Sequence, residues 1–202
     1  MEAQGPGDCI VLKGPEKYSN HTNYGRDTQF TGTFYDKTPR TEDGEDFKKV
    51  ILAIDATDYS KKNFAQFKQE EILRELNKAY SGFLNGAGEK GKIATGNWGC
   101  GAFKGNSHLK ALIQVMAASQ VGCDELLYCT DNDGFRVKLA EVIERLKDKE
   151  CTVGMLYSCV LECIRIMPTV KYSDDVHILD MILDILEKDQ ISMSKCVSID
   201  EM

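Results

Sequence analysis

A glycine-rich turn between an apolar strand and an apolar helix decides the fold of this sequence: residues 92–117 read KIATGNWGCGAFKGNSHLKALIQVMA. The residues before the turn, 92–95, predict a short strand. After the turn, Asn106 or Ser107 can cap a helix whose apolar residues recur at helical spacing, at Leu109, Leu112, Ile113, Met116 and Ala117. The stretch therefore predicts a strand–turn–helix unit, which is a building block of α/β sheets.

The composition of the turn favours an anion site. Glycines at positions 96, 99, 101 and 105 let the backbone turn tightly and approach a ligand where a Cβ would clash. The amides and the dipole at the start of the next helix favour an anion such as a diphosphate, which needs no lysine there. A ligand-free connection between strand and helix is the alternative interpretation.

The glycine spacing differs from that of dinucleotide-binding turns, in which the third glycine comes one residue earlier. Asp131, however, follows the next predicted strand, where a nicotinamide-dinucleotide domain carries its ribose-binding acid. A domain of that class therefore stays open as a further alternative.

The rest of the chain alternates between short apolar runs and helical patterns. Strands are predicted at 9–12, 50–56 and 126–129, and helices at 72–83, 135–149, 152–167 and 176–188. The run at 50–56 is apolar almost throughout, which predicts a strand buried on both faces. Residues 16–47 show no periodicity and predict a long loop. This alternation predicts an α/β fold with helices on both faces of the sheet.

The composition excludes several classes of protein. The chain has 202 residues, of which 42% are hydrophobic and 28% charged, as in folded globular domains rather than disordered chains. Its formal net charge of −7 argues against a broad cationic face, so we expect no direct contact with DNA. No window approaches the ~20 apolar residues that span a bilayer. No secretory signal is visible at the start, and we expect no membrane partner.

The cysteines point to a reducing compartment. Eight occur without a CxxC pair, most of them within apolar runs, which predicts reduced thiols in the nucleus or cytoplasm. Cys159 and Cys163 lie one helical turn apart and could ligate a metal, but their apolar surroundings favour small core residues. We predict neither a metal nor another cofactor.

Several motifs together resemble the poly(ADP-ribose) glycohydrolase family. The strongest is the family's phosphate-loop signature, which reads ATGNWGCGAF at 94–103 and continues as LKALIQ at 109–114. Other matching motifs are RELNKAY at 74–80, IDA at 54–56, EKYS at 16–19 and TVG at 152–154. The resemblance thus covers about residues 8–165.

This resemblance implies a macrodomain-like mixed sheet flanked by helices, with a helical C-terminal part, that binds the terminal ADP-ribose of poly(ADP-ribose). Members of the family hydrolyse the ribose–ribose glycosidic bonds of this polymer. Carried over to this sequence, Tyr24 stacks on the adenine. Asn97 and a run of backbone hold the ribose and the diphosphate, namely Cys100, Gly101, Ala102 and Phe103. The resemblance also implies poly(ADP-ribosyl)ated proteins as partners, a nuclear or cytoplasmic location and a role in the response to DNA damage.

The family's catalytic acids belong to three glycines followed by Gln-Glu-Glu, upstream of the tyrosine-bearing stretch, and no such motif precedes Tyr24. A Gln-Glu-Glu occurs at 69–71, but without a glycine triplet and at a different place in the family's order. At helical spacing, Glu70 and Glu71 share polar stripes with Arg74, Glu75 and Lys78. These stripes predict a solvated face, which does not give a carboxyl the raised pKa of a general acid.

We therefore expect residues 1–202 to form one N-terminally truncated part of such a catalytic domain, with no catalytic residue and no hydrolysis by the isolated chain. The alternative is a non-catalytic module that binds ADP-ribose or its polymer. A sheet without its upstream strands has a bare edge and an uncovered apolar face, which favours oligomerisation or poor solubility.

Overall fold

The protein is described from a computed structural model, which covers residues 5, 8–23, 25–44, 46–87, 90–167, 170 and 172–188. The strands are β1 (Ile10–Lys13), β2 (Ser19–Thr22), β3 (Gln29–Thr33), β4 (Val50–Ala53), β5 (Lys92–Gly96) and β6 (Glu125–Cys129). The helices are α1 (Gln69–Gly86), α2 (Ser107–Val121), α3 (Asp133–Asp148), α4 (Val153–Arg165) and α5 (Ile178–Glu187). Short 3₁₀ turns lie at η1 (Gly25–Asp27), η2 (Asn63–Phe67) and η3 (Ser173–Asp175).

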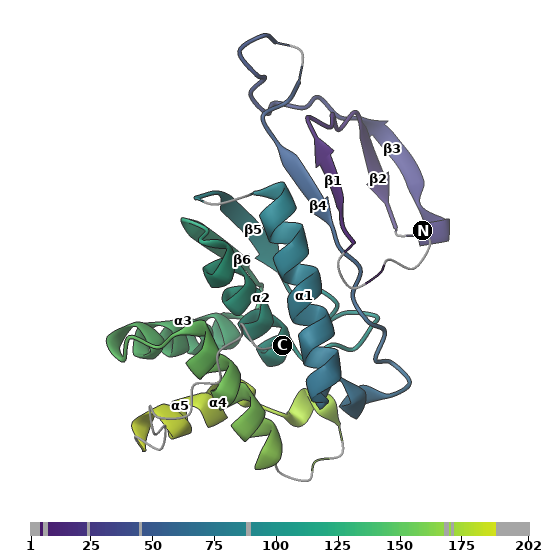
Figure 1. Ribbon diagram of the computed structural model, residues 1–202. Helices are drawn as coiled ribbons and strands as arrows, with labels where there is room; N and C mark the ends of the chain where they lie inside the picture. Colours follow the sequence, from purple (N-terminus) through teal and green to yellow (C-terminus); the bar gives the residue numbers. More distant parts are fainter. Residues whose placement is uncertain are drawn as a thin grey trace.

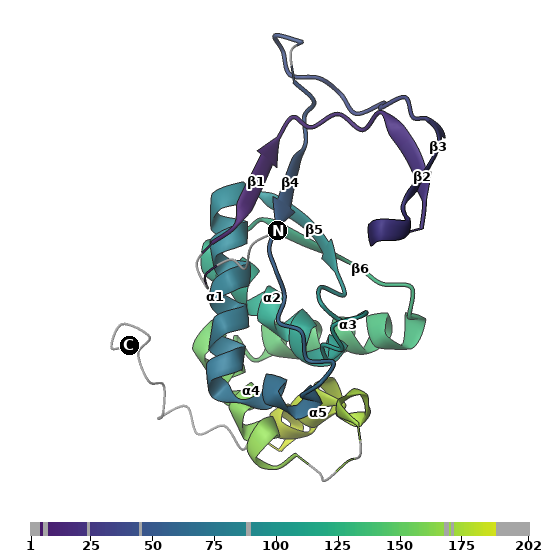
Figure 2. The ribbon, with the colours of Figure 1, turned by 90° about the vertical axis from the view of Figure 1, so that its right-hand side faces the viewer.

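The described strands form three separate pairs. β1 pairs with β4 and β2 with β3, both antiparallel, whereas β5 pairs with β6 in parallel. Strands β1, β4, β5 and β6 follow one another across the molecule in that order (Figures 1 and 2). The predicted mixed α/β fold is therefore confirmed. The two main strand pairs, β1–β4 and β5–β6, lie next to each other without joining into one sheet.

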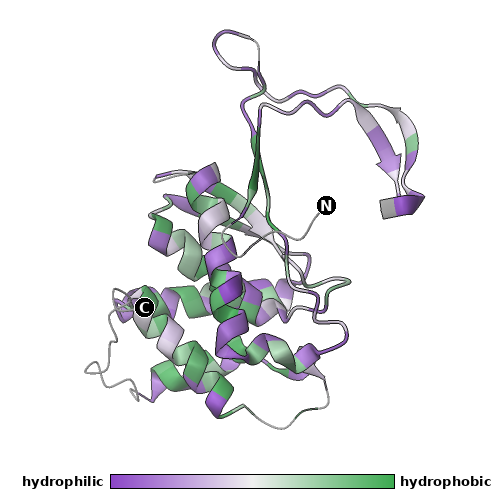
Figure 3. Ribbon diagram, turned by 45° about the vertical axis from the view of Figure 1, so that its right-hand side comes forward, coloured by the Kyte–Doolittle hydropathy of each residue, from purple (hydrophilic) through white to green (hydrophobic). Residues whose placement is uncertain are grey.

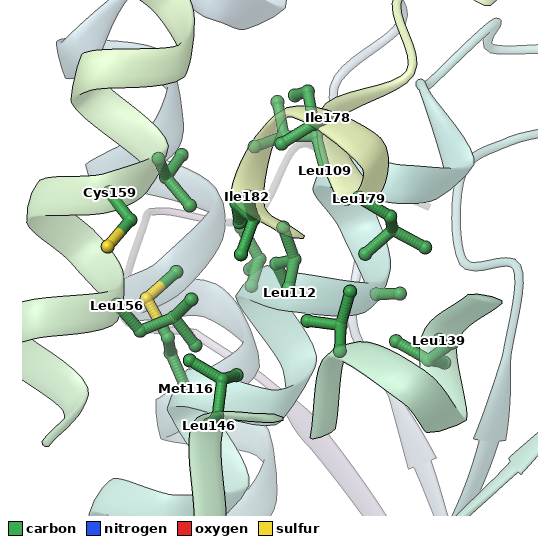
Figure 4. Close-up of a cluster of buried hydrophobic side chains, with 14 of the residues drawn as sticks. Leu109, Leu112, Met116, Leu139, Leu146, Leu156, Cys159, Ile178, Leu179 and Ile182 are labelled. Atoms are coloured by element: carbon green, nitrogen blue, oxygen red, sulfur yellow. The ribbon is translucent and has the colours of Figure 1, made fainter. Parts of the chain in front are cut away.

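The hydrophobic core lies mainly between the helices. All five residues of the predicted apolar face of α2 are buried, and they pack with side chains from the other helices. Figure 4 shows this cluster, with labelled members Leu109, Leu112, Met116, Leu139, Leu146, Leu156, Cys159, Ile178, Leu179 and Ile182. Cys159 and Cys163 belong to the core, as predicted, and burial raises the pKa of their thiols to about 11 and about 12. The predicted C-terminal helices are confirmed as α3, α4 and α5.

Burial of 50–56 on both faces was a wrong prediction, because Val50 and Ile51 are 46% and 47% exposed. Helix α1 covers one face of β4, where a Cβ on Gly86 would clash with Leu52. On the opposite face Ile51 lies beside Leu12 of β1, and both are exposed. In the β5–β6 pair, Ala94 lies beside Leu127, and both are exposed too. The prediction of an uncovered apolar face is therefore confirmed, and helices on both faces are not found among the described residues.

Residues 16–47 are more regular than predicted. They contain the hairpin of β2 and β3, which stands away from the helices and is coloured largely hydrophilic in Figure 3. The sequence signal was missing because β2 reads Ser-Asn-His-Thr, with no apolar alternation, and the register shifts between Asn20 and His21. Tyr24 lies outside the described residues. Among the described residues, no helix combines the length and the apolar character that crossing a membrane requires.

Candidate functional site

The glycine-rich loop runs from the end of β5 to the start of α2 as a series of tight turns. The amide of Cys100 donates to the carbonyl of Asn97 over 3.1 Å, and Gly105 donates to Gly99 over 3.0 Å. Gly99 has a φ of 75°, and a Cβ there would lie 2.7 Å from the Cβ of Ala56. Glycine is therefore required at this position for both conformation and space, as the sequence predicted.

Neighbouring segments anchor the end of the loop that leads into α2. The amide of Tyr59 donates to the carbonyl of Phe103 over 2.9 Å. Asn106 is 2% exposed and caps α2 by accepting a hydrogen bond from the amide of Leu109. Its own amide group donates to the carbonyls of Ser173 and Val176, each over 2.9 Å. The start of α2 is thereby tied to the segment before α5.

Three predicted site residues lie in an exposed stretch of the loop. The amides of Gly101, Ala102 and Phe103 donate to no protein group within the described part of the chain. All three residues are exposed, and a Cβ at Gly101 would meet no atom within 4 Å. Exposed amides in a row just before a helix N-terminus are the arrangement that binds phosphate groups.

Asn97 is also exposed at the beginning of the loop. Its side-chain oxygen accepts a hydrogen bond of 3.0 Å from the hydroxyl of Tyr128, which lies on β6. Burial raises the pKa of Tyr128, so the phenol stays a hydrogen-bond donor. Tyr128 thus orients Asn97 and leaves the amide nitrogen to face a ligand. Sequence reasoning missed this tyrosine, because only the pairing of β5 with β6 brings the two residues together.

A buried charge network lies beneath the loop. Glu75 of α1 forms ion pairs with Lys110 of α2 and with Arg74. Asp55, which follows β4, pairs with Arg74 and with Lys78, each over 2.8 Å. Glu75 and Lys78 are 1% and 0% exposed, so the predicted solvated stripe is wrong at both positions. The physical reason is that a distant segment supplies each charge with a partner of opposite sign, Lys110 for Glu75 and Asp55 for Lys78.

Lys110 is the member of this network nearest the loop. A Cβ added to Gly99 would lie 3.3 Å from its Nζ, and that Nζ lies 3.9 Å from the centre of the Trp98 ring. Burial, with a smaller effect of the Arg74 guanidinium, lowers the pKa of Lys110 from 10.5 to about 7. The loop therefore rests on a buried lysine whose pKa lies well below its ordinary value.

The comparisons with known proteins agree with this geometry. The matching family model is described as poly (ADP-ribose) glycohydrolase (PARG), macro domain fold, and it matches residues 1–136. The chain belongs to this family. The loop, Asn97 and the whole charge network lie inside the matched residues.

Curated relatives carry the same family name. The chain is 28% identical over 197 residues to "Probable poly(ADP-ribose) glycohydrolase 2" of Arabidopsis thaliana, covering 77% of this chain and 37% of that protein. It is 33% identical over 172 residues to "Poly(ADP-ribose) glycohydrolase 1" of Caenorhabditis elegans, covering 76% of this chain and 21% of that protein. The chain thus spans only about a fifth to two fifths of the length of these relatives.

Three carboxylates that the sequence analysis considered, those of Glu70, Glu71 and Asp131, can now be placed in the structure. Glu70 is exposed, as predicted, and forms a long ion pair of 3.8 Å with Lys68. Glu71 is half-buried and accepts a hydrogen bond of 3.2 Å from the hydroxyl of Tyr59. Asp131 is exposed just beyond β6. None of these contacts assigns a catalytic role. Within the described ranges, no group of three His, Cys, Asp or Glu residues is arranged to hold a metal ion.

Proposed function

We propose that the chain binds an ADP-ribosyl group of poly(ADP-ribose) through residues 97–103 and does not cleave the polymer by itself. The observation that carries the proposal is the row of exposed amides at Gly101, Ala102 and Phe103. These amides offer a diphosphate several backbone donors in a loop that is anchored at Phe103 and Asn106. Asn97 adds a side-chain amide, oriented by Tyr128, on the β5 side of the loop.

The charges beneath the loop support an anionic ligand. Arg74, Lys78 and Lys110 bring three cations to the network, and Asp55 and Glu75 bring two anions. The local excess of positive charge favours a diphosphate even though the whole chain carries −7. Proteins that carry poly(ADP-ribose), in the nucleus or the cytoplasm, are the partners that follow from this proposal.

Hydrolysis is the second candidate, because the curated relatives are named as glycohydrolases. Glycoside hydrolysis uses two carboxyl groups that flank the scissile bond. Glu70 lies in solvent, and Glu71 already accepts a hydrogen bond from Tyr59, so no pair of free carboxyl groups is seen at these two positions. We expect no release of ADP-ribose from polymer by residues 1–202. Release that disappears in Glu70→Ala or Glu71→Ala would show that the chain is itself the enzyme.

Calorimetry with ADP-ribose and the Gly101→Val variant tests the binding proposal. Gly101 is exposed and a Cβ there meets no atom within 4 Å, so the fold should persist. We expect affinity to fall by at least about tenfold, because the diphosphate loses its approach to the backbone. Gly134→Val is the matched control, since that glycine is exposed on α3 and its Cβ would make only an ordinary contact of 3.5 Å. Equal affinity of both variants would refute the proposed site.

Calorimetry with NAD in place of ADP-ribose tests the alternative that the chain is a dinucleotide-binding domain. NAD contains the same diphosphate, so only tighter binding of NAD than of ADP-ribose would support this alternative. In that case Asp131→Ala should abolish the preference. We expect ADP-ribose to bind more tightly and Asp131→Ala to leave its affinity unchanged, because Asp131 lies in solvent beyond β6.

A further inference from the structure

A large cleft separates the two main strand pairs. It has a volume of about 900 Å³ and is lined by residues 50–54 of β4 and its end and by residues 92–95 of β5. Phe83, Gly86 and Ala87, from α1 and its end, also line it. At one end, the indole nitrogen of Trp98 donates to the carbonyl of Ile54 over 3.2 Å and bridges the two walls.

Both walls of the cleft are strand edges. Among the described residues, β4 pairs only with β1 and β5 only with β6, and in Figure 2 the open edges of β4 and β5 face each other. The bond from the Gly14 amide to the Lys49 carbonyl shows that Lys49 faces β1. Because hydrogen-bonding direction alternates along an antiparallel strand, the backbone groups of Val50, Leu52 and Ile54 face the cleft. The bond between Trp98 and the Ile54 carbonyl agrees with this assignment.

The surroundings of the cleft are apolar on both sides. On the α1 side, Phe83 and Ile93 are buried and belong to the core. On the other side, Ile51 and Leu127 extend the exposed apolar face on either flank of the cleft. A polypeptide that fills the cleft therefore needs apolar side chains on both faces, as the central strand of a covered sheet does.

Lysine side chains gather at one end of the cleft. Four lysines line the end of the cleft where β4 and β5 begin, namely Lys13, Lys48, Lys49 and Lys92, against the single acid Asp46. Lys49 pairs with Asp36, and Lys92 with Glu125. Lys13 and Lys48 have no acidic partner among the described residues. An acidic residue at the matching end of a polypeptide bound in the cleft would complement these two lysines.

We propose that this cleft accepts one apolar β-strand with an acidic end, supplied by glycohydrolase-family polypeptide from outside residues 1–202. Such a strand joins β1–β4 and β5–β6 into one mixed sheet, because its backbone bonds to both open edges. The lengths of the relatives favour this source, since most of each relative lies outside the part that this chain matches. The proposal concerns the strand edges, not the glycine-rich loop, so it stands or falls separately from ligand binding.

The probes are overlapping peptides of about fifteen residues, each long enough to hold a strand of ordinary length. They tile the part of the Caenorhabditis elegans relative that lies outside the matched region. Biolayer interferometry measures their binding to the full chain of residues 1–202. We expect one stretch with a continuous apolar run and an acidic end to bind saturably, and Lys13→Glu with Lys48→Glu to weaken it. Failure of every tile to bind overturns the proposal.

The backbone role of β4 is tested with Val50→Pro. This residue is exposed, and proline removes its cleft-facing N–H while remaining compatible with an open strand edge. We expect the peptide to bind about tenfold more weakly, because a hydrogen bond is lost and the ring obstructs the edge. Val50→Thr keeps the N–H and should bind normally.

Circular dichroism and thermal melting must show that both Val50 variants fold. Equal binding by the two variants contradicts strand addition at this edge. Dimerisation that Val50→Pro abolishes would identify a second copy of the chain as the occupant and would also overturn the proposal. ADP-ribose affinity, measured in parallel, reports on the loop alone.

Discussion

At the scale of single residues, Lys110 connects the buried charge network to the loop. Its ammonium lies against Glu75 and over Trp98, directly beneath Gly99. The other charged or titratable groups that act on it are Arg74, Asp55 and the Tyr59 ring. Burial lowers the pKa of Lys110 from 10.5 to about 7. A nearby anion favours the charged form and therefore raises this pKa.

Binding of ADP-ribose should consequently take up protons. We expect affinity to fall as pH rises through about 7, because the free chain then loses the Lys110 proton that the complex retains. Calorimetry in buffers of different ionisation enthalpy measures the uptake directly. In Lys110→Met the uptake should vanish, whereas Lys147→Met, at an exposed position of α3, should behave as the native chain. Unchanged uptake in Lys110→Met would show that another group titrates.

At the scale of elements, Asn106 at the start of α2 makes more hydrogen bonds than an ordinary helix cap. The side-chain oxygen of Asn106 accepts a hydrogen bond from the amide of Leu109, and its backbone amide donates to the side-chain oxygen of Gln66. Its side-chain amide donates to two carbonyls before α5. Asn132 performs only the capping part of this role for α3, where its side chain accepts the amide of Phe135 over 3.0 Å at an exposed site.

Replacing the two caps should therefore have unequal costs. We expect Asn106→Ala to lower the free energy of unfolding by about 2–4 kcal/mol, because it removes a cap and leaves the carbonyl of the buried Val176 without the bond from Asn106. Asn132→Ala should cost about 1 kcal/mol, the usual value of a lost cap. Chemical denaturation measures both values. Equal costs would mean that the contacts of Asn106 to Ser173 and Val176 do not hold the two segments together.

Local signals explain which elements could be predicted. The positive φ of Gly99 and the cap at Asn106 determine the backbone immediately around them. The loop and α2 could therefore be predicted from the sequence. The burial of Glu75 and Lys78 could not be predicted in this way, because their partners Lys110 and Asp55 come from other parts of the chain. The β2–β3 hairpin was missed because polar residues on both of its faces give no periodicity.

At the scale of the whole molecule, apolar side chains form an exposed face on the strands. Ile10 and Leu12 of β1, Ile51 of β4 and Leu127 of β6 are all at least a third exposed. In sequence these residues resemble buried strands, and only their exposure in the structure shows that this face is uncovered. Exposed apolar patches of this kind promote association.

We expect the chain to self-associate at micromolar concentrations, as the sequence already predicted. The double variant Ile51→Lys and Leu127→Lys should shift the sedimentation profile towards the monomer, because two charges interrupt the apolar face. Val137→Lys is the control, since Val137 is 64% exposed on α3, away from the strands. A native chain that stays monomeric across the concentration range would contradict this expectation.

Trp98 is the only tryptophan of the chain, and it stands where the cleft and the glycine-rich loop meet. Its indole is bonded to the β4 side and stacked on the Lys110 ammonium. The protein therefore contains one intrinsic optical probe whose emission responds both to a strand entering beside it and to a change of charge beneath it. The two events can be followed without labels and told apart, because only the second depends on pH near neutrality.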